Sequence, residues 1–255
     1  MTTATRARVQ HAAPPSVRRR RGPRIVRRLL RAVLALALLG IVLLGAGWVV
    51  TPSVDDAESR VAAHLAAHSA PALQGAIPLK MADALIATEN SRFYSVPGVD
   101  PISVVRAPIA LVLNRDQGGA TLEQQLVKNL YEQGSQSPTA QAVEGILALK
   151  LDASWSKAQI LRMYLDDGYY GHGFYGLTSA AKGYFGVRPA DLTWSQASLL
   201  AGLFQAPSAY DPFHHADVAR ARQLHVVDRL VAVGTLTRAD ADRVLAEPWG
   251  LRKLA

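Results

Sequence analysis

The chain has 255 residues, no cysteine and a formal net charge of +8. This length allows one or two domains with a sizeable core, and the lack of cysteine excludes disulfides and thiolate metal sites. The basic charge is confined to one end, because residues 1–31 contain ten arginines and no acid, while the remaining 18 Lys and Arg face 20 acids. The composition therefore argues against a nucleic-acid-binding face and indicates a basic tail.

The tail is followed by an uncharged apolar run over residues 32–50, which as a helix would span roughly 28 Å, enough to cross a bilayer. The run is longer than the apolar region of a cleaved signal peptide, so a retained anchor is favoured. Arginines precede it and acids follow it, which predicts a cytoplasmic N-terminus and an extracytoplasmic remainder. The predicted organisation is a disordered basic tail over 1–28, an anchor over 29–50, a linker over 51–76 and a folded domain over 77–250.

The first candidate acid, Glu89, ends a helix-like apolar pattern over residues 77–93. A carboxylate in this position is a candidate for proton transfer, and the alternative is an ordinary surface acid. Residues 99–115 are again apolar and read either as a core helix or as a segment that contacts lipid.

The most informative stretch is residues 118–129, GGATLEQQLVKN. Two glycines permit a tight turn, a threonine can cap a helix that starts directly after it, and the remaining residues read as that helix. Helical spacing places four polar side chains on or beside one face: Thr121, Gln124, Gln125 and Lys128. Such a face suits an anionic, hydroxyl-rich ligand such as a sugar phosphate, although an amphipathic surface helix would show the same pattern.

The rest of the chain predicts further helices. Glu144 lies on an apolar helix pattern over residues 143–151, and capping boxes at 156–159 and 193–196 open helices at 160–165 and 197–203. Two more amphipathic helices are predicted at 219–233 and 237–245. An S-x-x-K pattern at 154–157 occurs without K-T-G or S-D-N, which argues against a transpeptidase.

Five of these stretches together resemble the motifs of the peptidoglycan glycosyltransferase family, the lipid II polymerases found as single enzymes and as one module of class A penicillin-binding proteins. Residues 118–129 resemble G-G-S-T-x-x-Q-Q-x-x-K-N, and residues 140–152 resemble R-K-x-x-E-x-x-x-A-x-x-L-E. The five motifs occur in order, at residues 87–100, 118–129, 140–152, 156–186 and 205–212.

The resemblance implies a mainly α-helical, lysozyme-like two-lobed domain behind a single transmembrane helix, held outside the plasma membrane of a bacterium. It implies that Glu89 is the catalytic base for the acceptor 4-hydroxyl and that Glu144 is a second essential carboxylate. It also implies that five residues bind substrate: Thr121, Gln124, Gln125, Lys128 and Asn129.

The implied partners are lipid II, the growing glycan chain and the membrane, with cell-wall synthesis or division proteins as further partners and no nucleic acid. The sequence predicts no firm cofactor. A divalent cation, Mg²⁺ or Mn²⁺, would let Glu144 act beside a diphosphate, since a bare carboxylate would be repelled there. No metal ligand set is predicted, because His64 and His68 lack a third ligand in sequence and the pair at 214–215 reads as a solvated loop.

The sequence also departs from the family motifs. Asn90 and Val96 replace an Asp and a His, Ala140 and Gln141 replace the Arg-Lys pair that holds the diphosphate, and Arg162 replaces a Glu. Smaller changes are found at positions 120, 123 and 166. These departures leave one alternative to a polymerase, a weakened or inactive lipid II-binding scaffold. A second alternative is a lysozyme-like hydrolase that uses the same carboxylate pair to cleave finished glycan, because a lysozyme-like fold does not fix the reaction.

Overall fold

The computed structural model describes residues 22–103, 120–132 and 138–252, and the chain divides into two units, residues 1–46 and 47–255. The first unit holds most of helix α1 (Gly22–Val50). Residues Val26–Val50 of this helix are long and apolar enough to cross a membrane, with a mean hydropathy of 2.6. Its large side chains, such as Leu36 and Val42, are exposed, which fits a helix whose apolar surface meets lipid.

The described part of the second unit consists of helices, turns and one isolated bridge between Tyr169 and Tyr175. Its α-helices are α2 (Ala57–Ala67), α3 (Leu79–Glu89), α5 (Leu122–Val127), α6 (Pro138–Ser154), α7 (Lys157–Asp167), α8 (Gly176–Ala180), α9 (Trp194–Leu203), α10 (Ala216–Ala232) and α11 (Arg238–Ala246). Short π-helices, η1 (Lys128–Glu132) and η2 (Ala181–Phe185), and a 3₁₀ turn, η3 (Pro189–Asp191), complete the set. The mainly α-helical class predicted from the sequence is confirmed.

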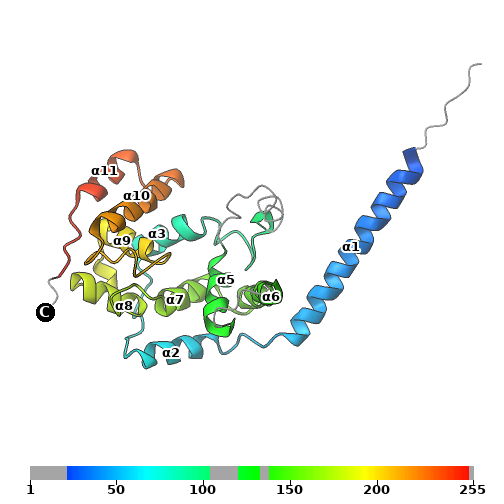
Figure 1. Cartoon of the computed structure of the whole chain (residues 1–255), viewed down its shortest axis with the longest axis horizontal. Helices are drawn as coiled ribbons and strands as arrows, with labels where there is room; N and C mark the ends of the chain where they lie inside the picture. The colour runs from blue at the N-terminus through cyan, green and yellow to red at the C-terminus, as the bar shows by residue number, and fades with distance from the viewer. Residues whose placement is uncertain (1–21, 104–119, 133–137, 253–255) are drawn as a thin grey trace, which may run out of the picture. The chain divides into compact units, whose positions relative to one another are not determined.

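The helices of the second unit pack as two groups (Figure 1). In the first lobe, α3, α9, α10 and α11 pack on one another; in the second lobe, α2, α5, α6 and α7 do so. This grouping is the two-lobed arrangement that the family resemblance implies. Helices α3 and α5 belong to different lobes, so a side chain that contacts both lobes lies where they meet.

Local hydrogen bonds set the starts of several helices. Capping boxes at Ser156 and Thr193 are formed as the sequence predicts. Thr121 caps α5 as predicted and does so as a full capping box, and Thr237 forms a fourth box at the start of α11. In each box the hydroxyl accepts from the backbone N–H three residues later, and that residue's side chain accepts from the cap's own N–H. These contacts span four residues, so sequence alone can identify them.

The segment predicted as a linker, residues 51–76, is packed into the second unit. Lys150, which is buried on α6, donates to the carbonyl oxygens of Thr51 at 2.8 Å and Pro52 at 3.0 Å. Helix α2 buries three apolar side chains in the core: Ala57, Val61 and Leu65. The segment is therefore part of the folded unit, which its alanine-rich sequence did not reveal. Most of the apolar segment 99–115, and the glycine pair at 118–119, lie outside the described residues.

Candidate active site

Glu89 is the last residue of α3, and its side chain is 16% exposed. Its Oε2 lies 3.4 Å from Nε2 of Gln125 on α5, and its Oε1 lies 3.5 Å from Nη2 of Arg222 on α10. One partner comes from each lobe, so Glu89 lies at their junction. The structure thus brings Glu89 together with one of the predicted substrate-binding residues, Gln125.

The orientation of the Gln125 amide is fixed by two further hydrogen bonds. Its Nε2 donates to the carbonyl oxygen of Ala120 at 3.2 Å, and its Oε1 accepts from the Tyr164 hydroxyl at 2.6 Å. Tyr164 is buried and stacks on Phe204, with ring centroids 5.0 Å apart. Burial, together with the nearby charge of Glu89, raises the pKa of Tyr164 well above its usual value, so its hydroxyl remains a donor. The amide NH₂ of Gln125 is therefore held toward Glu89.

Arg222 is the residue of this site that the sequence reasoning missed. Its side chain is 13% exposed, its Nε donates to the carbonyl oxygen of Gly202 at 3.3 Å, and its guanidinium lies 6.0 Å from the ring centroid of Tyr210. Helix α10 was predicted only as a packing element. One feature of the sequence could have identified Arg222. It lies beside the apolar positions of α10 that are buried, Ala219 and Val226, where a charge without a partner would be costly.

Thr121 and Gln124 were predicted to bind substrate, and in this structure both are engaged in capping α5. Thr121 is 2% exposed, and its hydroxyl donates to the carbonyl oxygen of Gly98 at 2.5 Å. The Gln124 side chain accepts from the Thr121 backbone N–H at 3.1 Å. These contacts hold the start of α5 against the loop that follows Glu89, so both residues support the position of Gln125.

Lys128 and Asn129 begin the π-helical turn η1, where the ordinary helical spacing no longer holds. Lys128 is half-buried. Asn129 donates to Oδ2 of Asp167 at 2.9 Å, and Oδ1 of Asp167 lies 2.8 Å from Nδ1 of His64. Asn129 is thus held on the side of α2 and α7. No sequence pattern indicated this partner for His64, because Asp167 lies far from it in the chain and only packing brings the two together.

Glu144 is half-buried on α6, in the same lobe as Gln125, since α6 packs against α5. Gln141, one of the two positions where the family has a cation, is exposed one turn earlier on this helix. Among the described residues, no group of three potential metal-ligand side chains includes Glu144.

Two of the departures from the family motifs meet at Lys157. Glu123 is fully buried, and its Oε1 accepts from Nζ of Lys157 at 2.6 Å. The same ammonium donates to the carbonyl oxygen of Val96 at 2.8 Å and pairs with Asp152 at 2.6 Å. Burial raises the pKa of Glu123 even beside this cation. Glu123 and Val96 thus join α5 and the loop after Glu89 to the start of α7.

Arg162 and Asn90 are two further departures from the family motifs, and they lie in different parts of the structure. Arg162 donates to the carbonyl oxygens of Leu73 at 2.7 Å and Gly75 at 2.5 Å, which ties the segment after α2 to α7. Asn90 caps the end of α3, and its buried Nδ2 has no hydrogen-bond partner within the described structure. The change at 162 is therefore accounted for by packing, whereas nothing in the structure explains the preference for Asn at 90.

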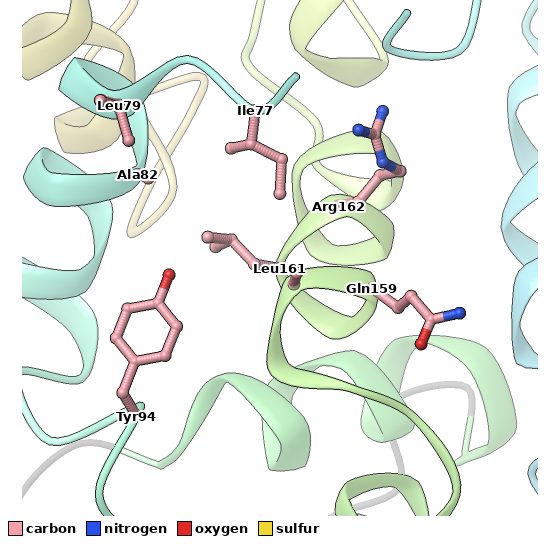
Figure 2. A pocket seen from close by; sticks show the side chains of 8 residues that line it. Ile77, Leu79, Ala82, Tyr94, Gln159, Leu161 and Arg162 are labelled. Atoms are coloured by element: carbon pink, nitrogen blue, oxygen red, sulfur yellow. The ribbon is translucent and has the colours of Figure 1, made fainter. Parts of the chain in front are cut away.

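A mainly apolar pocket between α3 and α7 is distinct from the Glu89 site (Figure 2). It is lined by Ile77, Leu79, Ala82, Tyr94, Ala158, Gln159, Leu161 and Arg162. None of the predicted site residues lines this pocket.

Comparison with known proteins is consistent with this geometry. A family model described as Transglycosylase matches residues 59–231. A Cupriavidus necator protein that carries the name transglycosylase is 36% identical over 179 residues, which are 70% of this chain and 78% of that protein. Penicillin-binding protein 1A of Neisseria flavescens is 39% identical over 172 residues, 67% of this chain but only 22% of its own length.

Among solved structures, penicillin-binding protein 1A from Haemophilus influenzae aligns with 69% of this chain and 17% of its own, at 21% identity and a TM-score of 0.42. The family match and the Cupriavidus relative establish the class: the chain belongs to the transglycosylase family. It is a peptidoglycan glycosyltransferase, as the motif resemblance implied.

Proposed function

We propose that this enzyme polymerises lipid II into glycan strands and releases undecaprenyl diphosphate while anchored in the membrane by α1. The observation that carries the proposal is the arrangement at the lobe junction, where Glu89 is flanked by Gln125 and Arg222. Membership of the transglycosylase family supports the reaction class.

Forming a glycosidic bond requires a base at the acceptor hydroxyl and stabilisation of the departing diphosphate. Glu89 accepts the proton of the acceptor 4-hydroxyl as its oxygen attacks the anomeric carbon of the donor. The fixed amide of Gln125 and the guanidinium of Arg222 orient the carboxylate. Lys128 stabilises the leaving diphosphate, and Glu144 assists by orienting a cationic group near it, because a carboxylate alone would repel the diphosphate.

The apolar helix α1 anchors the enzyme in the membrane that holds its substrate. Residues Val26–Val50 are long enough to span the hydrocarbon core, and basic residues precede them. A lipid-linked substrate remains in the bilayer, so anchoring the enzyme there raises the effective concentration of each for the other. The proposed topology places the N-terminus in the cytoplasm and residues after about Thr51 outside.

Incubation of the detergent-purified protein with labelled lipid II tests this function. The expected products are undecaprenyl diphosphate and a ladder of lengthening glycan. A hydrolase would leave lipid II intact and would shorten preformed glycan, and a scaffold would bind lipid II without consuming it. Either of those results would contradict the proposal.

Arg222 is proposed to be a positioning residue for Glu89. Replacing Arg222 with Met should lower kcat by about 10- to 100-fold and leave KM for lipid II nearly unchanged, because a hydrogen bond to a charged group contributes about 1.5–3 kcal/mol. Arg222→Lys should recover part of the loss. The matched control is Arg229→Met, since Arg229 also joins α10 to α3, through the carbonyl oxygen of Ala87 at 3.1 Å, without contacting Glu89. An equal loss of kcat in both Met variants would show that Arg222 has only a packing role.

A further inference from the structure

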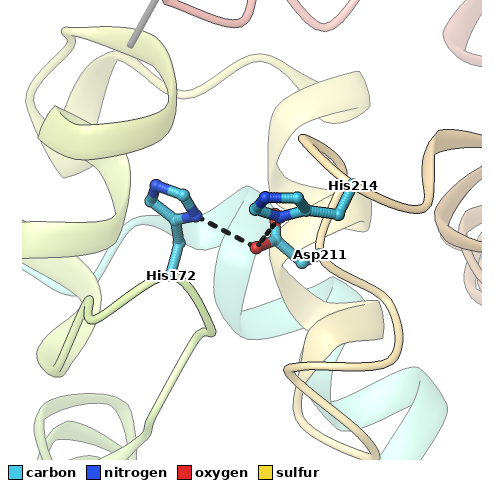
Figure 3. A group of neighbouring side chains, drawn as sticks. All are labelled: His172, Asp211 and His214. Atoms are coloured by element: carbon cyan, nitrogen blue, oxygen red, sulfur yellow. Dashed lines mark hydrogen bonds and ion pairs between the residues drawn. The ribbon is translucent and has the colours of Figure 1, made fainter. Parts of the chain in front are cut away.

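A cluster of metal-ligating side chains lies where the turn between α7 and α8 meets the segment between α9 and α10. It consists of His172, Asp211 and His214 (Figure 3). Nδ1 of each histidine lies 3.0 Å from Oδ2 of Asp211, and the three ligand atoms all lie within 4.8 Å of one another. In Figure 3 both rings turn a nitrogen toward the same carboxylate.

The 3.0 Å contacts of Asp211 with the two rings match the spacing of neighbouring ligands on one metal ion. Nitrogen and oxygen ligands bind Zn²⁺ at about 2.0–2.2 Å, so two ligands at right angles lie about 3.0 Å apart and two in a tetrahedral site about 3.4 Å apart. The contacts of Asp211 with both rings are 3.0 Å long. An ion can therefore be shared by Asp211 and both rings once the two histidine nitrogens, which lie within 4.8 Å of each other, approach to about 3.4 Å. Each ring then carries its proton on Nε2, because the Nδ1 that now donates to Asp211 becomes the metal ligand.

The carboxylate at the centre of the cluster is held in place by the fold. The side chain of Asp211 is 8% exposed, and its other oxygen, Oδ1, accepts from the backbone N–H of Phe213 at 3.0 Å. The ring of Phe213 also packs against the His172 ring, with centroids 4.8 Å apart. A hydrogen bond of this kind orients a ligating carboxylate in many metal sites.

The turn that carries His172 is likewise constrained. Gly171 has φ +84°, and a side chain there would collide with the carbonyl oxygen of Pro207. His172 itself has φ +52°, a left-handed conformation that is uncommon for residues other than glycine. The close packing of this turn against Pro207 holds His172 near Asp211.

We infer that His172, Asp211 and His214 form a binding site for a transition metal ion of the Zn²⁺ class. Two imidazoles and one carboxylate favour Zn²⁺, Co²⁺ or Ni²⁺ over Mg²⁺ and Ca²⁺, which prefer oxygen ligands. The site supplies three protein ligands, and because His214 is 62% exposed, water can fill the remaining positions. A bound ion would join the turn after α7 to the segment after α9.

The proposed metal site is connected to the proposed active site through Tyr210. Tyr210 directly precedes Asp211, and its ring lies 6.0 Å from the guanidinium of Arg222, which contacts Glu89. A metal at the cluster would restrict the movement of Tyr210 and of the segment between α9 and α10. The site is independent of the glycosyl-transfer chemistry and does not involve Glu144.

The test is a titration of the full-length, detergent-purified protein, made without a polyhistidine tag and stripped with EDTA. Zinc chloride alone should bind with one equivalent at low-micromolar Kd or tighter and raise the melting temperature. Cobalt chloride should give the visible absorption of a protein-bound Co²⁺ ion, whereas magnesium chloride should not bind. The absence of saturable Zn²⁺ binding up to about 100 µM, a free energy near 5.5 kcal/mol, would overturn the inference.

Variants assign the binding to these residues. His214→Ala and His172→Asn should each weaken Zn²⁺ binding more than about tenfold, since even outer partners of metal ligands contribute that much. Asn tolerates the left-handed conformation at position 172, so this variant should keep its fold. The matched controls are His215→Ala and His68→Ala, which should change the affinity less than twofold. Equal losses in a control and in His214→Ala would place the metal elsewhere and overturn the inference.

Discussion

Replacing Glu89 with Gln should reduce lipid II polymerisation by about 10²–10⁴-fold, the contribution expected of a general base. The amide keeps the shape of the side chain but cannot take the proton of the acceptor hydroxyl. The measurement is the initial rate at which undecaprenyl diphosphate is released from labelled lipid II. Binding of lipid II should be retained, because the proposed diphosphate contact lies with Lys128 rather than with the base.

The control for this variant is Glu58→Gln, which removes the same charge from an exposed position on α2. It should polymerise at the wild-type rate. Equal product from Glu89→Gln and Glu58→Gln would remove Glu89 from the mechanism, whatever the motif around it resembles.

Replacing Lys157 with Met should destabilise the folded unit by about 3–5 kcal/mol, because it leaves the buried carboxylate of Glu123 without its cation. One oxygen of that carboxylate already lacks a hydrogen-bond partner within the described structure. The measurement is the free energy of unfolding in denaturant. Lys182→Met, at an exposed position, is the control and should change it by less than about 0.5 kcal/mol.

The double variant Glu123→Gln with Lys157→Met should be more stable than Lys157→Met alone, since it removes the unpaired charge. A double variant no more stable than the single one would show that the loss comes from the other contacts of Lys157, with Asp152 and Val96. The comparison separates the cost of the buried charge from the loss of packing.

The loss in Lys157→Met should also depend on pH. Burial raises the pKa of Glu123, so the folded state holds that proton more tightly than the unfolded state does. Stability from this group is fully present below the usual carboxyl pKa and is lost as the pH rises through the raised value. Lys157 lowers this pKa in the wild type, so its removal should raise the pKa of Glu123 further. The difference in stability between Lys157→Met and wild type should therefore be smaller at pH 5 than at pH 8. A difference that does not change with pH would contradict a buried charge as its cause.

The mainly helical class, the starts of α5, α7 and α9, and the family were accessible from the sequence alone. The helix starts depend on capping contacts between residues three apart, such as Thr121 with Gln124 and Ser156 with Gln159. Such contacts recur at fixed spacing, so a linear pattern predicts them. The motif around Glu89 identified the candidate base for the same reason, because its neighbours in the chain carry the resemblance.

Only the tertiary structure showed which side chains far apart in the sequence meet. Arg222 reaches Glu89 from 133 positions away, Asp167 meets His64 across 103, and Asp211 meets His172 across 39. None of these pairs lies at a helical or hairpin spacing, so no local pattern distinguishes them from other residues of the same type. Their contacts depend on how the helices of the two lobes pack, and that packing is set by the buried apolar surface of the whole domain rather than by any short stretch of chain.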